Sequence, residues 1–581
     1  MNIIFSGFFH PVIGIITGLL LVFGSEFVGK ISLRKFINTF FFLNFIFGLI
    51  LVSSINFILI LTGLSKFLSI IFTYVLLSFG FYNFFLILKK FNFSKILYYE
   101  SYFILLIIFL LLILSVTPPT MADSLDYHLG VANFVNQNYN WPNPNMWLHA
   151  NISGLGEVYN FLGLNVYSDV AGSLSQAVGL ASFLHYFSNI IKNYQKKILF
   201  NLFIIGSPVI IFLVSGAKFL LLPQLTTTLV LYYLVSNKKL NENLFLLIVF
   251  LLCGAANFKL SFLISGLVLG LVALMKIKIT SKIFVKSTLI ILFFFLPKAL
   301  FNFFNYGDFG LLNIFVVAPD EFLLSLNHFQ ENHYTFPLNL FIPESLGKLS
   351  TVLGLQVFLF LLLKNICIEN KKILIIATVV SVLYYFFSMS IGRMYFEILL
   401  WLSLFFIFPV SFRINLCVIK FYLILNFLIV FMLIVYGLYN LAPGLLNNNF
   451  RKEVMKKNAY EYNAASWINE KIPQNKIILT NIRSISLLNN FTISMDYLNY
   501  RISDEKLKNY LSFLKESKIN YLILKNFTEE SHYLFKNCKE ISRTKSPLFI
   551  KETRNPFNRQ EKYFVILIEF ENEHLNKCMQ N

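Results

Sequence analysis

The sequence predicts a polytopic α-helical membrane protein that carries a small α/β domain at its C-terminal end. The first observation is composition, because 57% of the 581 residues are hydrophobic, 17% are aromatic and the mean hydropathy is +0.68, whereas soluble domains are roughly 45–50% apolar. The second is that apolar runs recur from residue 4 to about residue 440. The third is that charged and apolar residues alternate after Tyr439, as in soluble elements.

The apolar runs define the predicted membrane spans. A spanning helix needs about 20 mostly apolar residues, and by this criterion we predict about 14 spans, with limits near 4–23, 37–60, 66–88, 100–117, 170–190, 198–215, 218–236, 243–258, 260–276, 284–301, 349–364, 373–391, 394–410 and 417–440. The first run lacks a preceding basic segment and a small-residue cleavage site, so we expect a retained span rather than a signal peptide.

The distribution of lysine and arginine predicts the orientation, because basic residues in short loops stay on the cytoplasmic side. With the N-terminus outside, every predicted inner loop is basic, and the two long loops at about 118–169 and 302–348 fall outside. We therefore expect an N-out/C-out topology in which any chemistry faces outward. The formal charge of +19 is scattered over short loops and forms no stripe, which excludes a nucleic-acid partner.

The domain boundary is predicted at the end of the last span, so that residues 1–442 form the transmembrane domain and residues 443–581 form an outer α/β domain. In the latter, amphipathic helices at 459–472 and 502–516 alternate with apolar strands, which lie at 476–480, 521–525 and 563–570. The five cysteines show no metal-binding spacing.

The segment SVTPPTMADSLDYHLG, Ser115–Gly130, contains the first candidate catalytic residues. Two prolines end an apolar run, and Asp123, Asp126 and His128 follow within six residues. Charged residues near a membrane are expensive to bury and often functional, and a carboxylate there can serve as a general base or a metal ligand. The alternative is that a loop leaving the bilayer simply needs polar residues. Two acids, a histidine and the flanking prolines together favour a functional site.

Three cations are exceptions to the positive-inside pattern. Lys218, Lys259 and Arg393 lie in very short outer turns or at span ends. Arginine offers a planar fork and lysine a point charge to phosphate oxygens, so the set predicts a site for a lipid-linked phosphate. Snorkelling of a long side chain to the interface is the alternative for each residue taken singly.

The first long loop contains a further candidate surface between Trp141 and Phe161. His149 and Glu157, beside two tryptophans, can form hydrogen bonds to a sugar or another polar acceptor, although tryptophan is enriched at membrane interfaces in any case. No full octahedral set of metal ligands is visible, so a divalent metal is compatible with the site without being required.

These features together resemble the GT-C superfamily of polytopic glycosyltransferases. The segment DSLDYHL, Asp123–Leu129, is similar to the D-x-L-x-Y-H-L signature of bacterial membrane proteins related to the mannosyltransferase and aminoarabinose-transferase branch. The resemblance extends over about residues 100 to 440. Weaker matches are GEVYNFLG at 156–163, GAANFKLSF at 254–262, LPKALFNFFNYGDF at 296–309 and GRMYFEILLWL at 392–402.

The resemblance implies transfer of a sugar from a polyprenyl-phosphate donor to an envelope lipid, glycan or protein on the outer side of a bacterial inner membrane. Its catalytic aspartate maps onto Asp123, with Asp126 as the competing choice, and His128 would orient the carboxylate or bind the donor phosphate. No cofactor is required by such a reaction.

The same resemblance gives roles to the other candidates. Lys259 and Arg393, with Lys218, would stabilise the leaving phosphate, and Tyr395 would join the residues that bind the acceptor or sugar. Two alternatives from other classes stay open. One is a transporter or flippase of a lipid-linked glycan, and the other is a non-catalytic envelope protein that binds glycans.

Overall fold

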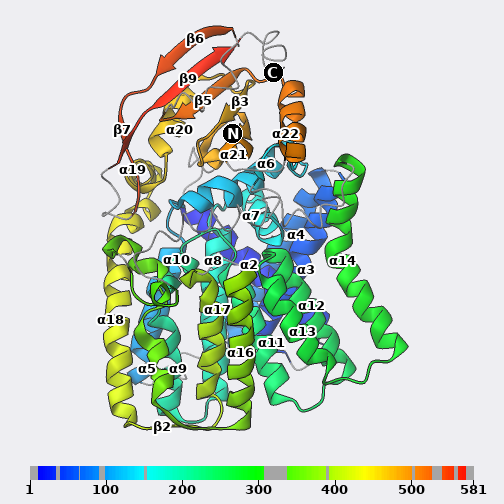
Figure 1. Ribbon diagram of the computed structural model, residues 1–581, viewed down its shortest axis with the longest axis vertical. Helices are drawn as coiled ribbons and strands as arrows, with labels where there is room; N and C mark the ends of the chain where they lie inside the picture. Colours follow the sequence, from blue (N-terminus) through cyan, green and yellow to red (C-terminus); the bar gives the residue numbers. More distant parts are fainter. Residues whose placement is uncertain are drawn as a thin grey trace.

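The computed structural model describes residues 11–34, 39–63, 66–90, 99–148, 153–306, 336–343, 345–387, 391–499, 504–526, 539–554 and 561–570. A bundle of helices forms most of the molecule, and a small sheet domain covers one end of it (Figure 1). Within the described ranges, six helices are long and apolar enough to cross a membrane. This number and length of apolar helices fit a multi-pass membrane protein.

Most of the predicted spans correspond to helices, although their bounds differ by several residues. The bundle helices are α2 (Pro11–Leu33), α3 (Phe41–Leu61), α4 (Lys66–Lys90), α5 (Tyr99–Ser115), α8 (Ala171–Ile190), α9 (Tyr194–Ile205), α10 (Val209–Val214), α11 (Leu221–Ser236), α12 (Glu242–Phe258), α13 (Phe262–Leu274), α14 (Ser281–Tyr306), α16 (Ile368–Phe387), α17 (Gly392–Ser403) and α18 (Leu416–Leu441). The six candidate spans lie in α2, α3, α4, α14, α16 and α18.

Three predicted spans are not continuous α-helices. The run at 394–410 is α-helical in α17 only to Ser403 and continues as the 3₁₀ helix η8 (Leu404–Phe406). The run at 198–215 is divided into α9 and α10 at Pro208, because proline has no N–H to donate and its ring obstructs the preceding turn. The run at 349–364 forms the 3₁₀ helices η6 (Leu346–Thr351) and η7 (Leu355–Leu362), which are separated by Gly354 at φ +88°. Strand β1 (Leu363–Ile366) follows and pairs antiparallel with β2 (Val410–Phe412).

Four of the six candidate spans present apolar side chains on the outside of the bundle. Only 17% of the candidate span in α14, 22% of that in α4 and 33% of those in α16 and α18 is buried, whereas 72% of that in α3 is buried. Their exposed large side chains include Phe284, Leu289, Phe386, Phe421 and Met432. Apolar surface of this extent requires apolar surroundings, and a lipid bilayer supplies them.

The C-terminal domain is built on a five-stranded sheet of order β4-β3-β5-β9-β6. Strand β3 (Ile477–Thr480) is parallel to β4 (Phe491–Ser494) and β5 (Tyr521–Lys525), while β9 (Val565–Phe570) runs antiparallel between β5 and β6 (Glu540–Lys545). The accompanying elements are α19 (Asn448–Asn458), α20 (Tyr462–Lys471), α21 (Asp496–Asn499), α22 (Asp504–Glu516) and the strands β7 (Phe549–Ile550) and β8 (Lys562–Tyr563). The predicted α/β character of this region is confirmed.

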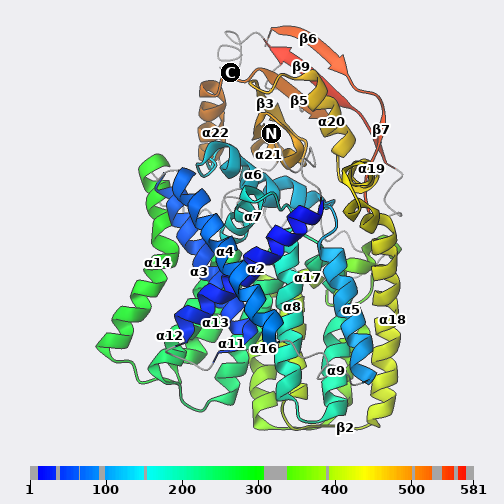
Figure 2. The same cartoon turned by 180° about the vertical axis from the view of Figure 1, so that it is seen from behind.

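The first long loop carries two helices, α6 (Leu129–Asn138) and α7 (Leu155–Asn165), which lie between the bundle and the sheet domain in both views (Figures 1 and 2). The backbone N–H of Tyr460 donates to the carbonyl oxygen of Thr120 at 3.2 Å. A nearly fully buried ion pair joins Arg451 of α19 to Asp169 at the end of the loop. The loop and the C-terminal domain therefore pack as one interface. Most of the second long loop, 307–335, lies outside the described residues.

Glycines allow α2, α3 and α4 to pack closely. A Cβ added at Gly29 would lie 1.9 Å from the carbonyl oxygen of Asn44, and one at Gly48 would lie 1.8 Å from a carbonyl oxygen of α2. Small residues permit such contact between membrane helices, where van der Waals packing drives association. The contact buries Glu26, whose carboxylate accepts hydrogen bonds from the side chains of Asn44 and Asn83 at 2.9 and 2.6 Å.

Replacing Gly48 with alanine is expected to separate α2 from α3 and to destabilise the protein by roughly 1–3 kcal/mol, as overpacking of a tight contact does. Thermal unfolding of the purified full-length protein in detergent measures the effect. Gly270→Ala is the matched control, because a Cβ at Gly270 meets nothing within 4 Å. Equal melting temperatures for the two variants would contradict the proposed role of the glycine contact.

Candidate functional site

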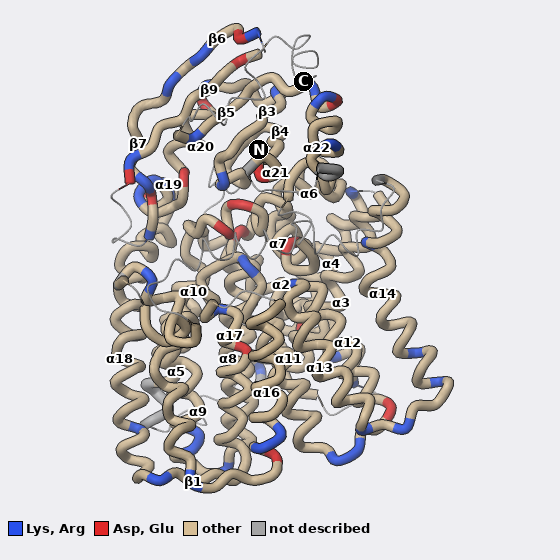
Figure 3. The backbone as a smooth tube through the Cα atoms, viewed as in Figure 1, with Lys and Arg blue, Asp and Glu red and all other residues tan. Residues whose placement is uncertain are grey.

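The candidate catalytic residues lie on a tight turn directly after α5. The chain passes Pro118 and Pro119 and enters a five-residue π-helix, η2 (Ser124–His128), with Asp123 at its N-cap. Short π-helical segments are rare and frequently occur at functional sites. The turn buries His128 almost completely and leaves 23% of the Asp123 side chain exposed. Several acidic residues lie near the middle of the molecule, below the sheet domain (Figure 3).

Three cations from three different parts of the chain meet at Asp123. Lys218 Nζ lies 3.0 Å and Arg393 Nη1 lies 3.2 Å from Asp123 Oδ2. Arg483 of the C-terminal domain places Nη2 3.0 Å from Asp123 Oδ1 and Nε 3.3 Å from Asp126 Oδ2. The C-terminal domain therefore contributes a side chain to this site, which the sequence did not predict.

The electrostatics of the cluster follow from these contacts. Burial alone would raise the pKa of the Asp123 carboxyl, but Lys218, Arg393 and Arg483 hold that pKa well below its usual range. Burial and then repulsion by Lys218 and Arg393 lower the pKa of the neighbouring Lys259 well below its usual value. Four cations thus share the space around two carboxylates, and this excess of positive charge favours binding of an anion.

Lys218 is positioned by a buried side chain from α8. Gln176 Nε2 donates to the carbonyl oxygen of Gly216 at 2.8 Å, and Gln176 Oε1 accepts from the backbone N–H groups of Leu220 and Leu221, each at 3.0 Å. One glutamine therefore fixes both ends of the irregular segment between α10 and α11. Lys218 belongs to this segment, so the glutamine also fixes the position of its side chain.

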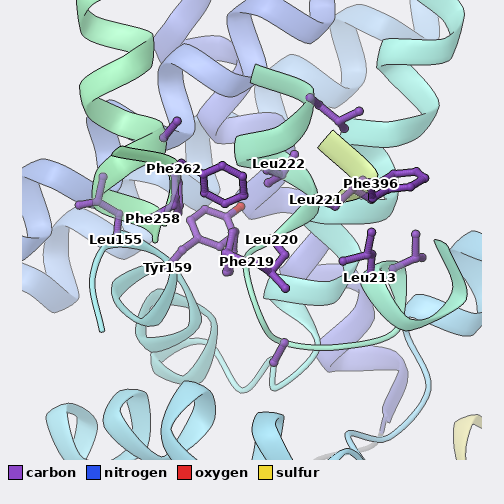
Figure 4. Close-up of a cluster of buried hydrophobic side chains, with 14 of the residues drawn as sticks. Leu155, Tyr159, Leu213, Phe219, Leu220, Leu221, Leu222, Phe258, Phe262 and Phe396 are labelled. Atoms are coloured by element: carbon purple, nitrogen blue, oxygen red, sulfur yellow. The ribbon is translucent and has the colours of Figure 1, made fainter. Parts of the chain in front are cut away.

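An apolar cluster below the site brings the two lysines together (Figure 4). The ring of Phe219 stacks on that of Phe258 with centroids 5.3 Å apart and an interplanar angle of 12°. Tyr159 of α7 meets Phe219 edge-on at 5.8 Å. Because Phe219 follows Lys218 and Phe258 precedes Lys259, the buried stack holds the two backbone segments side by side.

Arg393 is positioned at the first turn of α17. Its carbonyl oxygen accepts a hydrogen bond from Gln224 Nε2 at 2.7 Å, and its guanidinium lies 5.6 Å from the ring centroid of Phe212. A Cβ at the preceding Gly392 would lie 2.3 Å from the carbonyl oxygen of Thr351, so only glycine permits this approach. This close packing fixes the backbone at Arg393 and with it the position of the guanidinium.

Arg483 is positioned by a buried carboxylate of its own domain. Glu461 Oε2 accepts from the backbone N–H groups of Arg483 and Ser484 at 2.9 and 3.1 Å, while Lys525 Nζ lies 2.7 Å from Glu461 Oε1. No sequence signal identified Arg483, Glu461 or Gln176, because their partners are distant in the chain and single polar residues form no motif.

His128 and Glu157 form a pair behind the cation cluster. His128 Nδ1 lies 2.5 Å from Glu157 Oε1, and Glu157 Oε2 accepts from the backbone N–H of Gly154 at 2.6 Å. Asn160 Nδ2 donates to the carbonyl oxygens of both His128 and Ala217, at 3.3 and 3.0 Å. The same amide therefore joins η2 to the segment that carries Lys218.

The predicted acceptor-binding residues do not all reach this site. Glu157 does, through His128, whereas Tyr395 packs against α16 and donates its hydroxyl to the carbonyl oxygen of Ser381 at 2.9 Å. His149 lies outside the described residues. Across the described ranges, no group of three or more histidine, cysteine, aspartate or glutamate side chains is arranged to hold a metal ion.

Comparison with protein families divides the chain into two matched parts. A family model described as the DUF1420 N-terminal domain matches residues 75–455, and one described as the DUF1420 C-terminal domain matches residues 456–581. The chain belongs to the DUF1420 family. Searches of curated proteins and of solved structures each gave no significant match. In this DUF1420 chain the junction of the two matched parts falls inside α19, whereas the sequence predicted a boundary between residues 442 and 443.

Replacing Gln176 with leucine is expected to lower the free energy of unfolding by roughly 2–5 kcal/mol, because it leaves three backbone groups without their partner. Thermal unfolding of the full-length protein measures the change. Gln356→Leu is the matched control, since Gln356 is equally buried but donates to a single carbonyl oxygen, that of Leu353. A loss no larger than that of the control would show that Gln176 does not fix the segment.

Proposed function

We propose that this DUF1420 protein is a membrane glycosyltransferase that moves a sugar from a polyprenyl-phosphate donor to an envelope lipid, glycan or protein. The observation that carries the proposal is the convergence of Lys218, Arg393 and Arg483 on the Asp123 carboxylate, with Lys259 near enough for its charge to interact with Lys218, Arg393 and Asp123. Such a cluster suits a phosphate group, which offers more oxygens and more charge than the carboxylate that occupies it.

The cations would act on the leaving group. When the bond between the anomeric carbon and the phosphate oxygen breaks, negative charge gathers on the polyprenyl phosphate. Fixed cations in a site with little water stabilise that charge more in the transition state than in the ground state. The acceptor hydroxyl must also lose a proton, and the motif that supplies Asp123, Asp126 and His128 lies at the same place.

An apolar groove supports a donor with a lipid chain. The groove has a volume of about 380 Å³ and lies between α16 and α17, where Ala377, Val382, Ile398 and Leu402 line it. Arg393 stands on the first turn of α17, so one helix joins the cation cluster to the groove. In the proposed arrangement the phosphate lies at the cluster and part of the prenyl chain lies along the groove.

The charge distribution supports an outward-facing site with both ends of the chain outside. The proposal keeps the bacterial inner membrane and the about 14 spans that the sequence predicts. Lysine and arginine gather in the loops at the end of the bundle opposite the sheet domain (Figure 3). Basic residues in the predicted inner loops and the first turns of the helices that follow them include Lys196, Lys197, Lys238, Lys239, Lys278, Lys282, Lys371, Lys372 and Arg413. By the positive-inside rule that end is cytoplasmic, which places the site and the C-terminal domain outside.

One observation favours transport of a lipid-linked glycan as a second candidate function. Glu397 is fully buried in α17, and its carboxylate accepts hydrogen bonds from the hydroxyls of Thr227, at 2.5 Å, and Tyr384. Buried carboxylates inside membrane helices occur in the ion and proton pathways of transporters. Transport would require movement of the lipid between leaflets of reconstituted vesicles, and Glu397→Gln would abolish that movement.

Binding of a C55 polyprenyl phosphate tests the cation cluster. Full-length protein in nanodiscs is expected to bind this lipid at least about 10-fold more tightly than the uncharged C55 polyprenol, because hydrogen bonds to charged groups contribute about 1.5–3 kcal/mol. Lys218→Gln or Arg393→Gln should each weaken binding by about 10-fold or more. Lys286→Gln is the control, since Lys286 pairs with Glu242 on an exposed face. Equal affinity for the two lipids would contradict a phosphate site.

Replacing Asp123 with asparagine is expected to reduce sugar transfer by about 10²-fold or more, while the protein remains folded. The carboxylate is the shared anchor of three cations, and the resemblance also assigns it the role of base. Mass spectrometry of envelope glycans compares cells that contain the wild-type protein, the variant or neither. Full transfer by the variant would refute the proposed site.

A further inference from the structure

His128 has one ring nitrogen in use and one free. Its Nδ1 is engaged with Glu157 at 2.5 Å, whereas Nε2 is buried and has no hydrogen-bond partner within the described ranges. The side chain is only 4% exposed. A buried polar atom without a partner is costly, and a ligand group is one explanation for its retention. The unpartnered Nε2 is therefore available to contact a ligand group.

The carboxylate of Asp123 has no such freedom. Both of its oxygens accept from cations, Oδ2 from Lys218 and Arg393 and Oδ1 from Arg483. To take a proton, Asp123 would have to give up the charge that holds these three side chains in place. Asp126 is buried and bound to the same arginine. Both aspartates are therefore better suited to organising the cations than to accepting a proton.

The backbone of His128 is joined to the segment that carries Lys218. Asn160 Nδ2 donates to the carbonyl oxygens of both His128 and Ala217, the residue before Lys218. Both carbonyl oxygens lie within about 3.3 Å of Asn160 Nδ2. The positive charges of Lys218 and Lys259 also act on the imidazole. The negative charge of an anion bound at these lysines would therefore also act on the imidazole.

We propose that His128, paired with Glu157, is the general base of the transfer reaction, and that Asp123 serves to hold the cations. This inference rests on the proposed function. Glu157 accepts a hydrogen bond from the N–H at Nδ1, so the proton of the neutral imidazole stays on Nδ1 and the lone pair of Nε2 faces the acceptor hydroxyl in the proposed reaction. A carboxylate that orients an imidazole in this way also stabilises the imidazolium that forms.

The step balances as an ordinary substitution. The acceptor oxygen forms a bond to the anomeric carbon as the bond from that carbon to the phosphate oxygen breaks, and the electron pair of the broken bond leaves with the polyprenyl phosphate. The acceptor proton moves to His128 Nε2. Release to water or to the departing phosphate then restores the neutral imidazole, so no oxidant, reductant or further reactant is needed.

The electrostatic environment keeps the imidazole neutral before substrate binds. Burial, together with Lys218 and Lys259 and against the effect of Glu157, lowers the pKa of His128 to about 4. A bound phosphate neutralises the two lysines, so the imidazolium becomes easier to form when the donor is present. The base is thus most effective when both substrates are in place.

His128→Asn is the decisive variant, because the asparagine amide can still donate to Glu157 while the lone pair of Nε2 is lost. We expect the initial rate of transfer, followed by mass spectrometry of the glycan that forms in membrane preparations, to fall by about 10²–10⁴-fold. Affinity for C55 polyprenyl phosphate should stay within about 3-fold of wild type, since Lys218 and Arg393 are unchanged. His128→Ala should regain part of its rate when imidazole is added. His185→Asn, a change on α8 where His185 hydrogen-bonds to the side chain of Asn189, is the control.

The outcomes distinguish a failure of the proposed function from a failure of the proposed role of His128. If wild-type membranes form no additional glycan, the proposed function fails and this inference fails with it. If the wild type is active and His128→Asn transfers at the same rate, the function stands and the base is not His128. A loss of lipid affinity equal to the loss of rate, or an absence of imidazole rescue, would likewise assign His128 a structural role and overturn the inference.

Discussion

The constraint on which the site depends is an excess of positive charge in a partly buried space. Lys218, Lys259, Arg393 and Arg483 surround Asp123 and Asp126, so the carboxylates compensate only part of the charge. Burying uncompensated charge is costly, and a fold retains such a cluster only if the surrounding structure holds it together. The scaffold of residues around the cluster holds these like charges close to one another.

That scaffold is mostly apolar and acts through the residues next to the charged ones. The stack of Phe219 on Phe258 sets the spacing of the two lysines, and the glycine before Arg393 lets α17 start against its neighbour. Single buried amide side chains, chiefly those of Gln176 and Asn160, also position the site. Their hydrogen bonds go to backbone groups of the segment that carries Lys218. Repulsion between the cations is therefore opposed by packing and backbone hydrogen bonds instead of by additional acids.

The sequence predicted the parts of this arrangement that depend on local pattern. Apolar runs located most helices, and alternation of residue types located β3, β5 and β9. The aspartates and three of the cations were found because charges at a membrane surface are exceptional. Arg483 escaped detection because an arginine in a soluble domain is ordinary, and its role arises only when the sheet domain packs on the first long loop. The run at 349–364 was predicted as one continuous helix, whereas it forms two 3₁₀ helices, because hydropathy does not register the turn at Gly354.

Both matched parts of the chain contribute residues to the site. Asp123, Lys218, Lys259 and Arg393 belong to the part that matches the DUF1420 N-terminal domain, whereas Arg483 and its supporting Glu461 belong to the part that matches the C-terminal domain. Neither part contains the complete set of contacts to Asp123. Because the sheet domain also hydrogen-bonds to Thr120, three residues before Asp123, its docking determines both the position of η2 and the last ligand of the carboxylate. The C-terminal domain is therefore a component of the charge cluster, and its movement away from the bundle would free one oxygen of Asp123.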